Sequence, residues 1–256
     1  MIKFFRRIRQ KLLQENRFTQ YLLYAVGEIV LVVIGILIAI KINAYNTQQD
    51  DMATIKNQLE NVALELESNI ALLEETIEKS EAIINSSRAL VTIISLQEDV
   101  SSQKLSEIIG QSFAPVLNYQ PSTVILNEMI LSGSLVNLKN KQLKEMLLAF
   151  QSKQASLKNQ ELLHAEDQQS CTEEFLENGD FKAVTDDIGI SKSYYGLPNS
   201  VNRKGNKALL SSKTYENKVI LFMASAIGLE QGEYVPFKTY MENMLGTIEN
   251  ELKTYD

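Results

Sequence analysis

His164 and Cys171 are the two side chains best suited to metal or redox chemistry, and they are the only His and Cys in the chain. They share one helical face with Phe150 and Leu157, all at seven-residue spacing. Metal ligands that neighbour each other on a helix are three or four residues apart, whereas seven residues span two turns. We interpret the face as a seam in which His164 is partly buried and Cys171 fills space. An intermolecular disulfide through Cys171 stays open.

A cluster of three aspartates is the next candidate for chemistry. Asp180, Asp186 and Asp187 suggest calcium, because carboxylate oxygens are its usual ligands. The EF-hand spacing of acids and glycine is absent, so we interpret the segment as a solvated acidic loop. Acidic pairs elsewhere, such as Glu173-Glu174, fit solvated helix faces. We predict no catalytic constellation, no metal and no cofactor, and a protein that is not an enzyme.

Glu28 is the one charged residue between Tyr21 and Ile40. A carboxylate within an apolar membrane helix costs roughly 2.5–3.5 kcal/mol at mid-depth, so it needs a reason. At about 100° per residue, Gly35 and Ala39 each fall within about 20° of Glu28 around the helix. Gly35 and Ala39 are also two small residues four apart, which permits close approach of a second helix. These three residues are the predicted helix-packing stripe.

Three interpretations of Glu28 stay open. The first is a helix–helix contact with a second copy or another membrane protein, in which the carboxyl is protonated or hydrogen-bonded across the contact. In the second, the span lies further outward, Lys41 reaches the surface, and Glu28 lies at the cytoplasmic interface. The third is an ion- or proton-coupled accessory subunit that uses Glu28. The small-residue stripe favours the first.

Residues 21–43 are predicted to form a transmembrane helix. Every residue from Ile29 to Ile40 is apolar or glycine, and twenty helical residues rise roughly 30 Å, which matches a bilayer's hydrocarbon core. A cleaved signal peptide would be shorter and would end at a small-x-small site, which residues 40–43 do not offer. The apolar run Val219–Leu229 is too short to cross a bilayer. We therefore expect a single uncleaved span.

The net charge of −7 hides a basic N-terminus. Residues 1–20 carry six bases and one acid, so the rest of the chain carries −12. Because positive residues stay in the cytoplasm, the N-terminus should lie inside and residues 44–256 outside the cytoplasm. Whether the basic segment also lies on anionic lipid as an amphipathic helix, or only sets the topology, stays open. The split excludes a nucleic-acid-binding protein with a broad basic surface. The six bases are Lys3, Arg6, Arg7, Arg9, Lys11 and Arg17.

Residues 44–256 show the three-and-four spacing of apolar residues that is typical of long helices. Three such stretches occur, at about 47–97, 140–176 and 207–253, and the first should continue directly from the span because no breaker intervenes. Heptads with one shift of phase run along the first stretch. We predict an all-α fold in which the transmembrane helix continues into an antiparallel, up-down-up bundle of three long helices with almost no strand.

Two regions between the long stretches complete this prediction. Short helices at about 101–132 should cap the far end of the bundle, and a loop at 179–206 should then lie on the membrane side. This loop contains the most aromatic patch, Ser193–Pro198, which suits contact with a membrane, a partner or the bundle itself. Pro236 should kink or break the third stretch near Gly232.

Three N-terminal segments are distinctive: MIKFFRRIRQKLL at 1–13, YAVGEIVLVVIGILIA at 24–39, and Ile42-Asn43. Over residues 1–46 the chain resembles an uncharacterised family of membrane proteins from Bacteroidota, known as a domain of unknown function. The segments 119–122 and 131–135 resemble it more weakly, and Tyr45 stands where members often have Trp. The resemblance implies an inner-membrane protein with a periplasmic helical domain, and it implies no activity, ligand or catalytic residue.

Two functions follow as hypotheses. The leading one is a membrane-anchored, non-enzymatic periplasmic interaction or scaffold protein that self-associates. Its partners would be the lipid bilayer and a second copy or another membrane protein, and not nucleic acid. The alternative is a periplasmic sensor or ligand-binding module, because helical bundles can transmit small helix shifts. A cytoplasmic segment of about twenty residues is too short for an effector domain, so such a sensor would signal through a separate partner.

Overall fold

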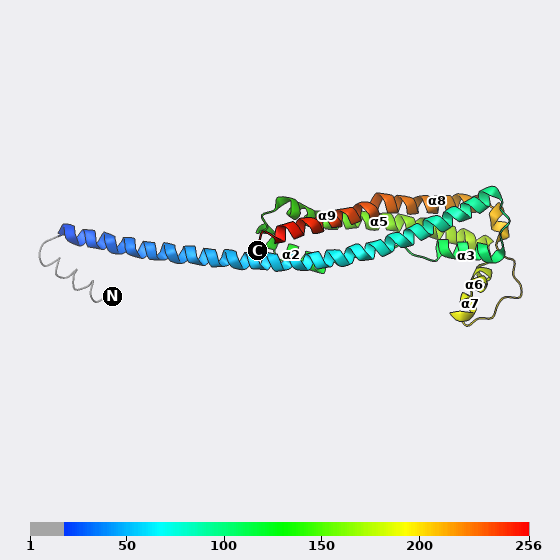
Figure 1. The fold of residues 1–256 in the computed structure, drawn as a ribbon, viewed down its shortest axis with the longest axis horizontal. Helices are drawn as coiled ribbons and strands as arrows, with labels where there is room; N and C mark the ends of the chain where they lie inside the picture. Colours follow the sequence, from blue (N-terminus) through cyan, green and yellow to red (C-terminus); the bar gives the residue numbers. More distant parts are fainter. Residues whose placement is uncertain (1–17, 256) are drawn as a thin grey trace. The chain divides into compact units, whose positions relative to one another are not determined.

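The computed structural model describes residues 18–255, and their side chains from Leu22 onward. Every regular element in that range is a helix and none is a strand, which confirms the all-α class for the described chain. The chain divides into two compact units (Figure 1), one ending at Ile55 and the other formed by residues 56–256. Each unit is described by itself.

Helix α2, Phe18–Leu96, is the longest element and belongs to both units. Its 79 residues contain no proline, and no glycine after Gly35, so nothing interrupts the backbone hydrogen-bond ladder. Residues 22–50 are exposed, apart from Ala25 and Glu28, which are half-buried. The helix is therefore continuous from the apolar segment into the first long stretch, as the sequence predicts.

From residue 56 onward, α2 buries one face. Buried apolar residues recur there mostly at steps of three and four, which is the spacing of a helix packed against neighbours on one side. The three-and-four spacing predicted for the first stretch is thereby confirmed in this unit. The buried apolar residues of this face are Leu59, Val62, Leu66, Leu73, Ile83, Ile84, Leu90, Ile93 and Ile94.

Two further helical segments complete the bundle. One is α5, Lys141–Asn178, and the other is α8, Lys213–Leu229, followed by α9, Val235–Leu252. Polar contacts join the start of α5 to the end of α9, and the end of α5 to the start of α8, so the two segments are antiparallel. These contacts are Asn140 Nδ2 to Glu251 Oε2 at 3.0 Å, Ser156 Oγ to Glu233 Oε1 at 3.2 Å, and Lys218 Nζ to the Ser170 carbonyl at 3.2 Å.

Helix α2 is also antiparallel to the segment formed by α8 and α9. Lys238 Nζ lies 2.6 Å from Glu74 Oε1, and Ser95 Oγ donates to Glu216 Oε1 at 3.1 Å. Residue numbers therefore increase along α2 in the direction in which they decrease along α8 and α9. In this unit α2 and α5 therefore run parallel to each other. The predicted up-down-up order is wrong, and the observed order is up-up-down.

The connection between α2 and α5 explains this order. It contains α3, Ser102–Phe113, α4, Val124–Leu131, and the short 3₁₀ turn η1, Ser134–Val136. Its contacts move backward along α5, because the Phe113 carbonyl accepts from Gln168 Nε2 at 2.9 Å while Asn127 Oδ1 accepts from Gln151 Nε2 at 2.5 Å. Only α3 lies at the far end, and the rest runs down the bundle instead of capping it. The connection does so because it buries apolar side chains of its own: Leu117, Tyr119, Leu126 and Met129.

The tip segment, residues 179–206, contains α6, Phe181–Asp187, and α7, Ile190–Ser193. Ser106 Oγ donates to Asp187 Oδ2 at 2.7 Å, which ties α6 to α3. The tip segment therefore lies at the end of the second unit where α2 finishes (Figure 1), opposite the end that Lys56 enters. Its predicted place at the end of the bundle nearer the membrane followed from the wrong order of helices and is also wrong.

One turn of π-helix, η3, Glu230–Tyr234, joins α8 to α9. Pro236 lacks an N–H and its ring clashes with the carbonyl four residues earlier, so an ordinary α-helix is disfavoured there. The wider turn accommodates the proline without ending the helix. The predicted break near Gly232 is therefore a local distortion within a continuous helix.

Candidate functional site

Within the described part of the chain, α2 is the one helix long and apolar enough to cross a membrane. None of its most apolar eighteen-residue window is buried by the rest of the chain. A helix that is apolar all round is normally covered by protein or by lipid. The exposed residues 22–43 therefore form a candidate membrane span.

The predicted helix-packing stripe lies on this span. Glu28, Gly35 and Ala39 belong to one uninterrupted helix, whose geometry places them along one side. Gly35 and Ala39 are exposed, and no atom of the chain lies within 4 Å of the place a Cβ on Gly35 would occupy. The stripe is thus accessible to a second helix at these small residues. The six predicted membrane-surface bases, Lys3, Arg6, Arg7, Arg9, Lys11 and Arg17, lie outside the described residues.

The predicted seam on α5 is confirmed, and His164 is buried more fully than the sequence suggests. Phe150, Leu157, His164 and Cys171 are all at most 2 % exposed. Burial raises the pKa of the Cys171 thiol to about 12, so this thiol is unreactive at neutral pH. Among residues 22–255, no group of three or more potential metal ligands gathers around either residue.

The imidazole of His164 packs between α5 and α8. Its Nδ1 lies 2.9 Å from Ser225 Oγ, and its ring stacks on Phe222 with centroids 4.9 Å apart. The Nε2 atom is buried and has no hydrogen-bond partner. Burial lowers the pKa of His164, and the negative charge of Asp167 opposes this only in part. His164 is therefore a neutral member of the core.

This burial makes stability depend on pH. Because the pKa of His164 is lower in the folded chain than its value of about 6.5 in the unfolded one, the unfolded chain binds protons more readily below that pH. We expect the free energy of unfolding to fall from pH 6.5 downward, by at most about 1.4 kcal/mol per pH unit. Chemical denaturation followed by circular dichroism at pH 7.5 and 5.5 measures this. His164→Gln should lack the change, and equal pH dependence in both proteins would contradict the prediction.

A further buried polar site is centred on Glu161, which was not among the residues predicted from the sequence. Glu161 of α5 is 2 % exposed, and its Oε1 accepts from the Tyr119 backbone N–H at 2.6 Å and from the Tyr234 hydroxyl at 2.8 Å. Its Oε2 accepts from Lys158 Nζ at 3.0 Å. One carboxylate thus joins α5, the connection that runs down the bundle, and the π turn.

The phenols around Glu161 extend the same network. The Tyr119 hydroxyl donates to the Asn69 carbonyl of α2 at 3.1 Å, and burial raises its pKa. Burial, followed by the negative charge of Glu161, raises the pKa of Tyr234. Both phenols therefore remain protonated donors, so the network holds all three long segments in register. These features are typical of a structural junction.

A cleft of about 250 Å³ lies beside this junction. Tyr119, Gln151, Gln154 and Lys158 contribute to its lining, so it presents amide groups and one ammonium. Lys158 also donates to Asn118 Oδ1 and is half-exposed. Because this ammonium is already paired with Glu161, the chemistry of the lining suits a small polar molecule.

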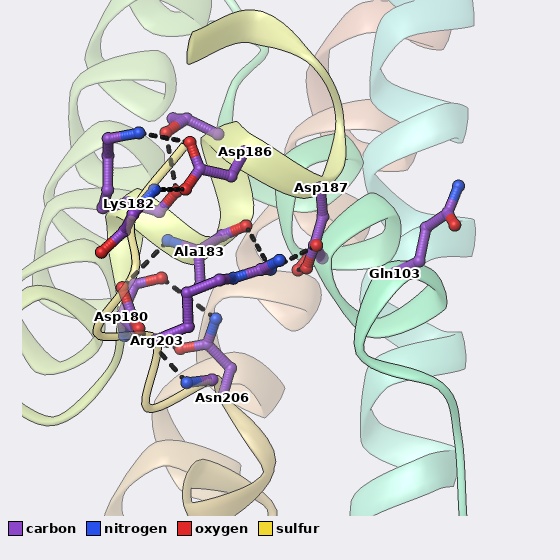
Figure 2. Close-up of polar contacts among 12 residues, drawn as sticks. Gln103, Asp180, Lys182, Ala183, Asp186, Asp187, Arg203 and Asn206 are labelled. Atoms are coloured by element: carbon purple, nitrogen blue, oxygen red, sulfur yellow. Dashed lines mark hydrogen bonds and ion pairs between the residues drawn. The ribbon is translucent and has the colours of Figure 1, made fainter. Parts of the chain in front are cut away.

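The aspartates of the tip segment are internal acceptors, as Figure 2 shows. The Asp186 side chain is fully buried and paired with Lys182, and its Oδ2 accepts from the Ser200 N–H at 2.8 Å. The ion pair with Lys182, together with hydrogen bonds, lowers the pKa of Asp186 to about 2. Lys182 Nζ also donates to Ser191 Oγ at 3.1 Å and to the Pro198 carbonyl at 2.8 Å.

The side chains of the other two aspartates also bind groups of their own segment. Asp187 is paired with Arg203, and Asp180 Oδ2 accepts from the N–H groups of Lys204 and Gly205 at 2.9 and 3.2 Å (Figure 2). The interpretation as a solvated acidic loop is therefore wrong. The three carboxylates are engaged by cations and N–H groups of their own segment, which leaves them suited to holding the loop and not to binding calcium.

No protein-family model, no curated protein and no solved structure matches this chain. The resemblance of residues 1–46 to a Bacteroidota family stays a prediction. A function is therefore inferred from the sequence and the structure of this chain alone.

Proposed function

We propose that this chain is a membrane-anchored, non-enzymatic interaction or scaffold protein that associates with itself through α2. The observation that carries the proposal is that α2 is one continuous helix. It has an exposed apolar segment and, from residue 56, an apolar face that is buried in the bundle. A helix that is lipid-coated in one part and packed in another is an anchor for the packed part.

The charge distribution supports an orientation for this anchor. Six bases precede the span and a single base, Lys41, ends it, which favours a cytoplasmic N-terminus. The second unit then lies outside the cytoplasm, and the resemblance over residues 1–46 favours the inner membrane and the periplasm. In this arrangement the lipid bilayer is the first partner.

The stripe supports self-association. Small residues at Gly35 and Ala39 let two backbones approach closely, and a protonated or hydrogen-bonded Glu28 adds a polar contact that lipid cannot offer. Another membrane protein with a similar helix is the alternative partner. An ion-coupled role for Glu28 ranks behind both, because it requires further polar groups along a pathway.

Cysteine crosslinking in native membranes tests this proposal. Gly35→Cys and Ala39→Cys should form disulfide-linked dimers on mild oxidation, whereas Leu37→Cys, about 200° from position 35 around the helix, should not. Cys171 is buried, so the unmodified chain is a clean background. Absence of dimers at both stripe positions, or equal dimers at all three, would exclude this mode of association.

The cleft beside Glu161 favours one second candidate, a ligand-binding or sensory module. Tyr119, which lines the cleft, is linked to the π turn, because Glu161 accepts hydrogen bonds from both Tyr119 and Tyr234. Thermal-shift measurements of the full chain in micelles with small polar metabolites test it. A ligand should raise the midpoint, and Lys158→Ala should remove that increase; a midpoint unmoved by every ligand tested would count against this role.

A further inference from the structure

The surface of the tip segment differs in charge from the rest of the second unit. Between Ile188 and Tyr215 the chain carries five Lys or Arg residues and no Asp or Glu, although residues beyond position 20 carry a net −12. The aspartates just before this stretch are turned inward, with the Asp186 side chain 0 % and the Asp187 side chain 10 % exposed. Arg203, Lys207 and Lys213 are paired with Asp187, Asp99 and Glu216, so Lys192 and Lys204 are the exposed bases of this stretch that lie outside a salt bridge in the described chain.

The same stretch also exposes apolar and aromatic side chains. Tyr194 is 81 % and Val201 is 95 % exposed, and Tyr195 and Leu197 are about half-exposed. The two tyrosine rings contact each other edge to face, with centroids 5.4 Å apart. We define the tip surface as these four side chains with the exposed lysines that flank them: Lys192, Tyr194, Tyr195, Leu197, Val201 and Lys204.

The backbone beneath the tip surface is held firmly. The Leu197 N–H donates to the Ser191 carbonyl at 2.8 Å, and Pro198 and Ser200 are bound by Lys182 and Asp186 from the inner side. Because the polar groups of this loop bond inward, its apolar side chains are held outward. These apolar side chains therefore stay exposed in the single chain, and exposed apolar patches mark sites of contact with a membrane or a protein.

We propose that the tip surface binds an anionic lipid bilayer opposite the one that contains α2. Tyrosine and aliphatic side chains beside lysines suit the boundary of a bilayer, where rings lie among headgroups and lysines meet lipid phosphates. The surface is a projecting loop and not a pocket, and a bilayer requires no matching shape. The charge complements anionic lipid and also an acidic protein, but the four exposed apolar side chains favour lipid.

The second unit is long enough to reach a bilayer other than the one that contains α2. The tip segment lies at the end of the second unit where α2 finishes, and the chain enters that unit at Lys56. Forty helical residues separate these ends, a distance of roughly 60 Å. The proposal rests on α2 as a membrane anchor, whereas the contact with a second bilayer goes beyond it.

Vesicle clustering with the full chain tests the proposal. The chain is reconstituted into phosphatidylcholine vesicles and mixed with acceptor vesicles of equal phosphatidylcholine and phosphatidylglycerol, and light scattering follows clustering. Clustering should require phosphatidylglycerol in the acceptors and weaken as salt rises. The triple variant Lys192→Ser, Tyr194→Ser and Val201→Ser should cluster at least about tenfold more slowly, since one lysine at an anionic surface accounts for about fivefold.

A matched control makes the same kinds of change at the other end of the bundle. Leu131 and Val136 are 86 % and 76 % exposed, so Leu131→Ser, Val136→Ser and Lys139→Ser should cluster vesicles like the unmodified chain. No clustering, clustering of neutral acceptors, or an unaffected tip variant would overturn the proposal. So would tip-dependent capture of an acidic protein without clustering. Flotation of the donor vesicles checks the anchor separately, so failure of the tip is distinguished from failure of the anchor.

Discussion

Replacing Glu161 by alanine should lower the free energy of unfolding of the bundle by about 2–6 kcal/mol. The change leaves two buried donors, the Tyr119 N–H and the Tyr234 hydroxyl, without their acceptor, and each unpaired group costs about 1–3 kcal/mol. Lys158 is half-exposed and can turn to water, so it adds little. For a unit of this size the thermal midpoint should drop by roughly 4–24 °C.

Two companion variants sharpen this prediction. Glu161→Gln keeps an acceptor oxygen in place and should lose much less stability than Glu161→Ala. Glu166→Ala changes an exposed glutamate on the same helix and should shift the midpoint only slightly. Thermal unfolding by circular dichroism compares them. A midpoint for Glu161→Ala equal to that of Glu166→Ala would show that the junction does not hold the bundle together.

Replacing Gly35 by isoleucine should weaken self-association at least about tenfold, which corresponds to about 1.4 kcal/mol. The branched side chain occupies the space beside Gly35 that is empty in the single chain and prevents a second backbone from approaching. The bundle should be unaffected, because Gly35 belongs to the first unit and the bundle is the second. Energy transfer between two labelled populations of the chain, diluted in lipid, measures the association.

Gly27 provides the matched control for this substitution. It lies in the same exposed helix, eight residues earlier, and points about 80° away from Gly35. Gly27→Ile adds the same side chain to the same span and should leave association nearly unchanged. Equal loss in both variants would indicate a general effect of bulk on the span, and no loss in either would remove the stripe from the contact.

The helices were predictable because their determinants are local. Apolar residues at three- and four-residue spacing, the cap at Asn140 and the absence of breakers along α2 define where helices occur. The direction of α5 was not predictable from those patterns, because an amphipathic face packs equally well either way. The signal was the long connection between α2 and α5, whose apolar residues Leu117 and Tyr119 require burial along the bundle.

The candidate sites likewise include some residues that local sequence patterns identify and others whose role depends on residues far away in the sequence. Gly35 and Ala39 could be proposed from the sequence because their spacing alone defines a stripe, and the stripe stays a prediction. Glu161 stands between Leu157 and His164 on the seam, and an acid at such a position signals a buried polar contact. Its acceptor role depends on Tyr119 and on a π turn far away in the sequence, which no local pattern specifies. The aromatic patch of the tip was evident in the sequence. The inward direction of its aspartates could be recognised only in the folded loop.

The most direct test of the central claim, that α2 is an uncleaved anchor that holds the bundle outside the cytoplasm, is labelling of Asn202→Cys with a membrane-impermeant maleimide in spheroplasts. Asn202 is exposed on the tip, and the native Cys171 is buried and does not react. The protein should be labelled without lysis, remain with the membrane after alkaline carbonate extraction, and show the mass of the full chain. Labelling only after lysis, or release of a shortened protein, would contradict the account.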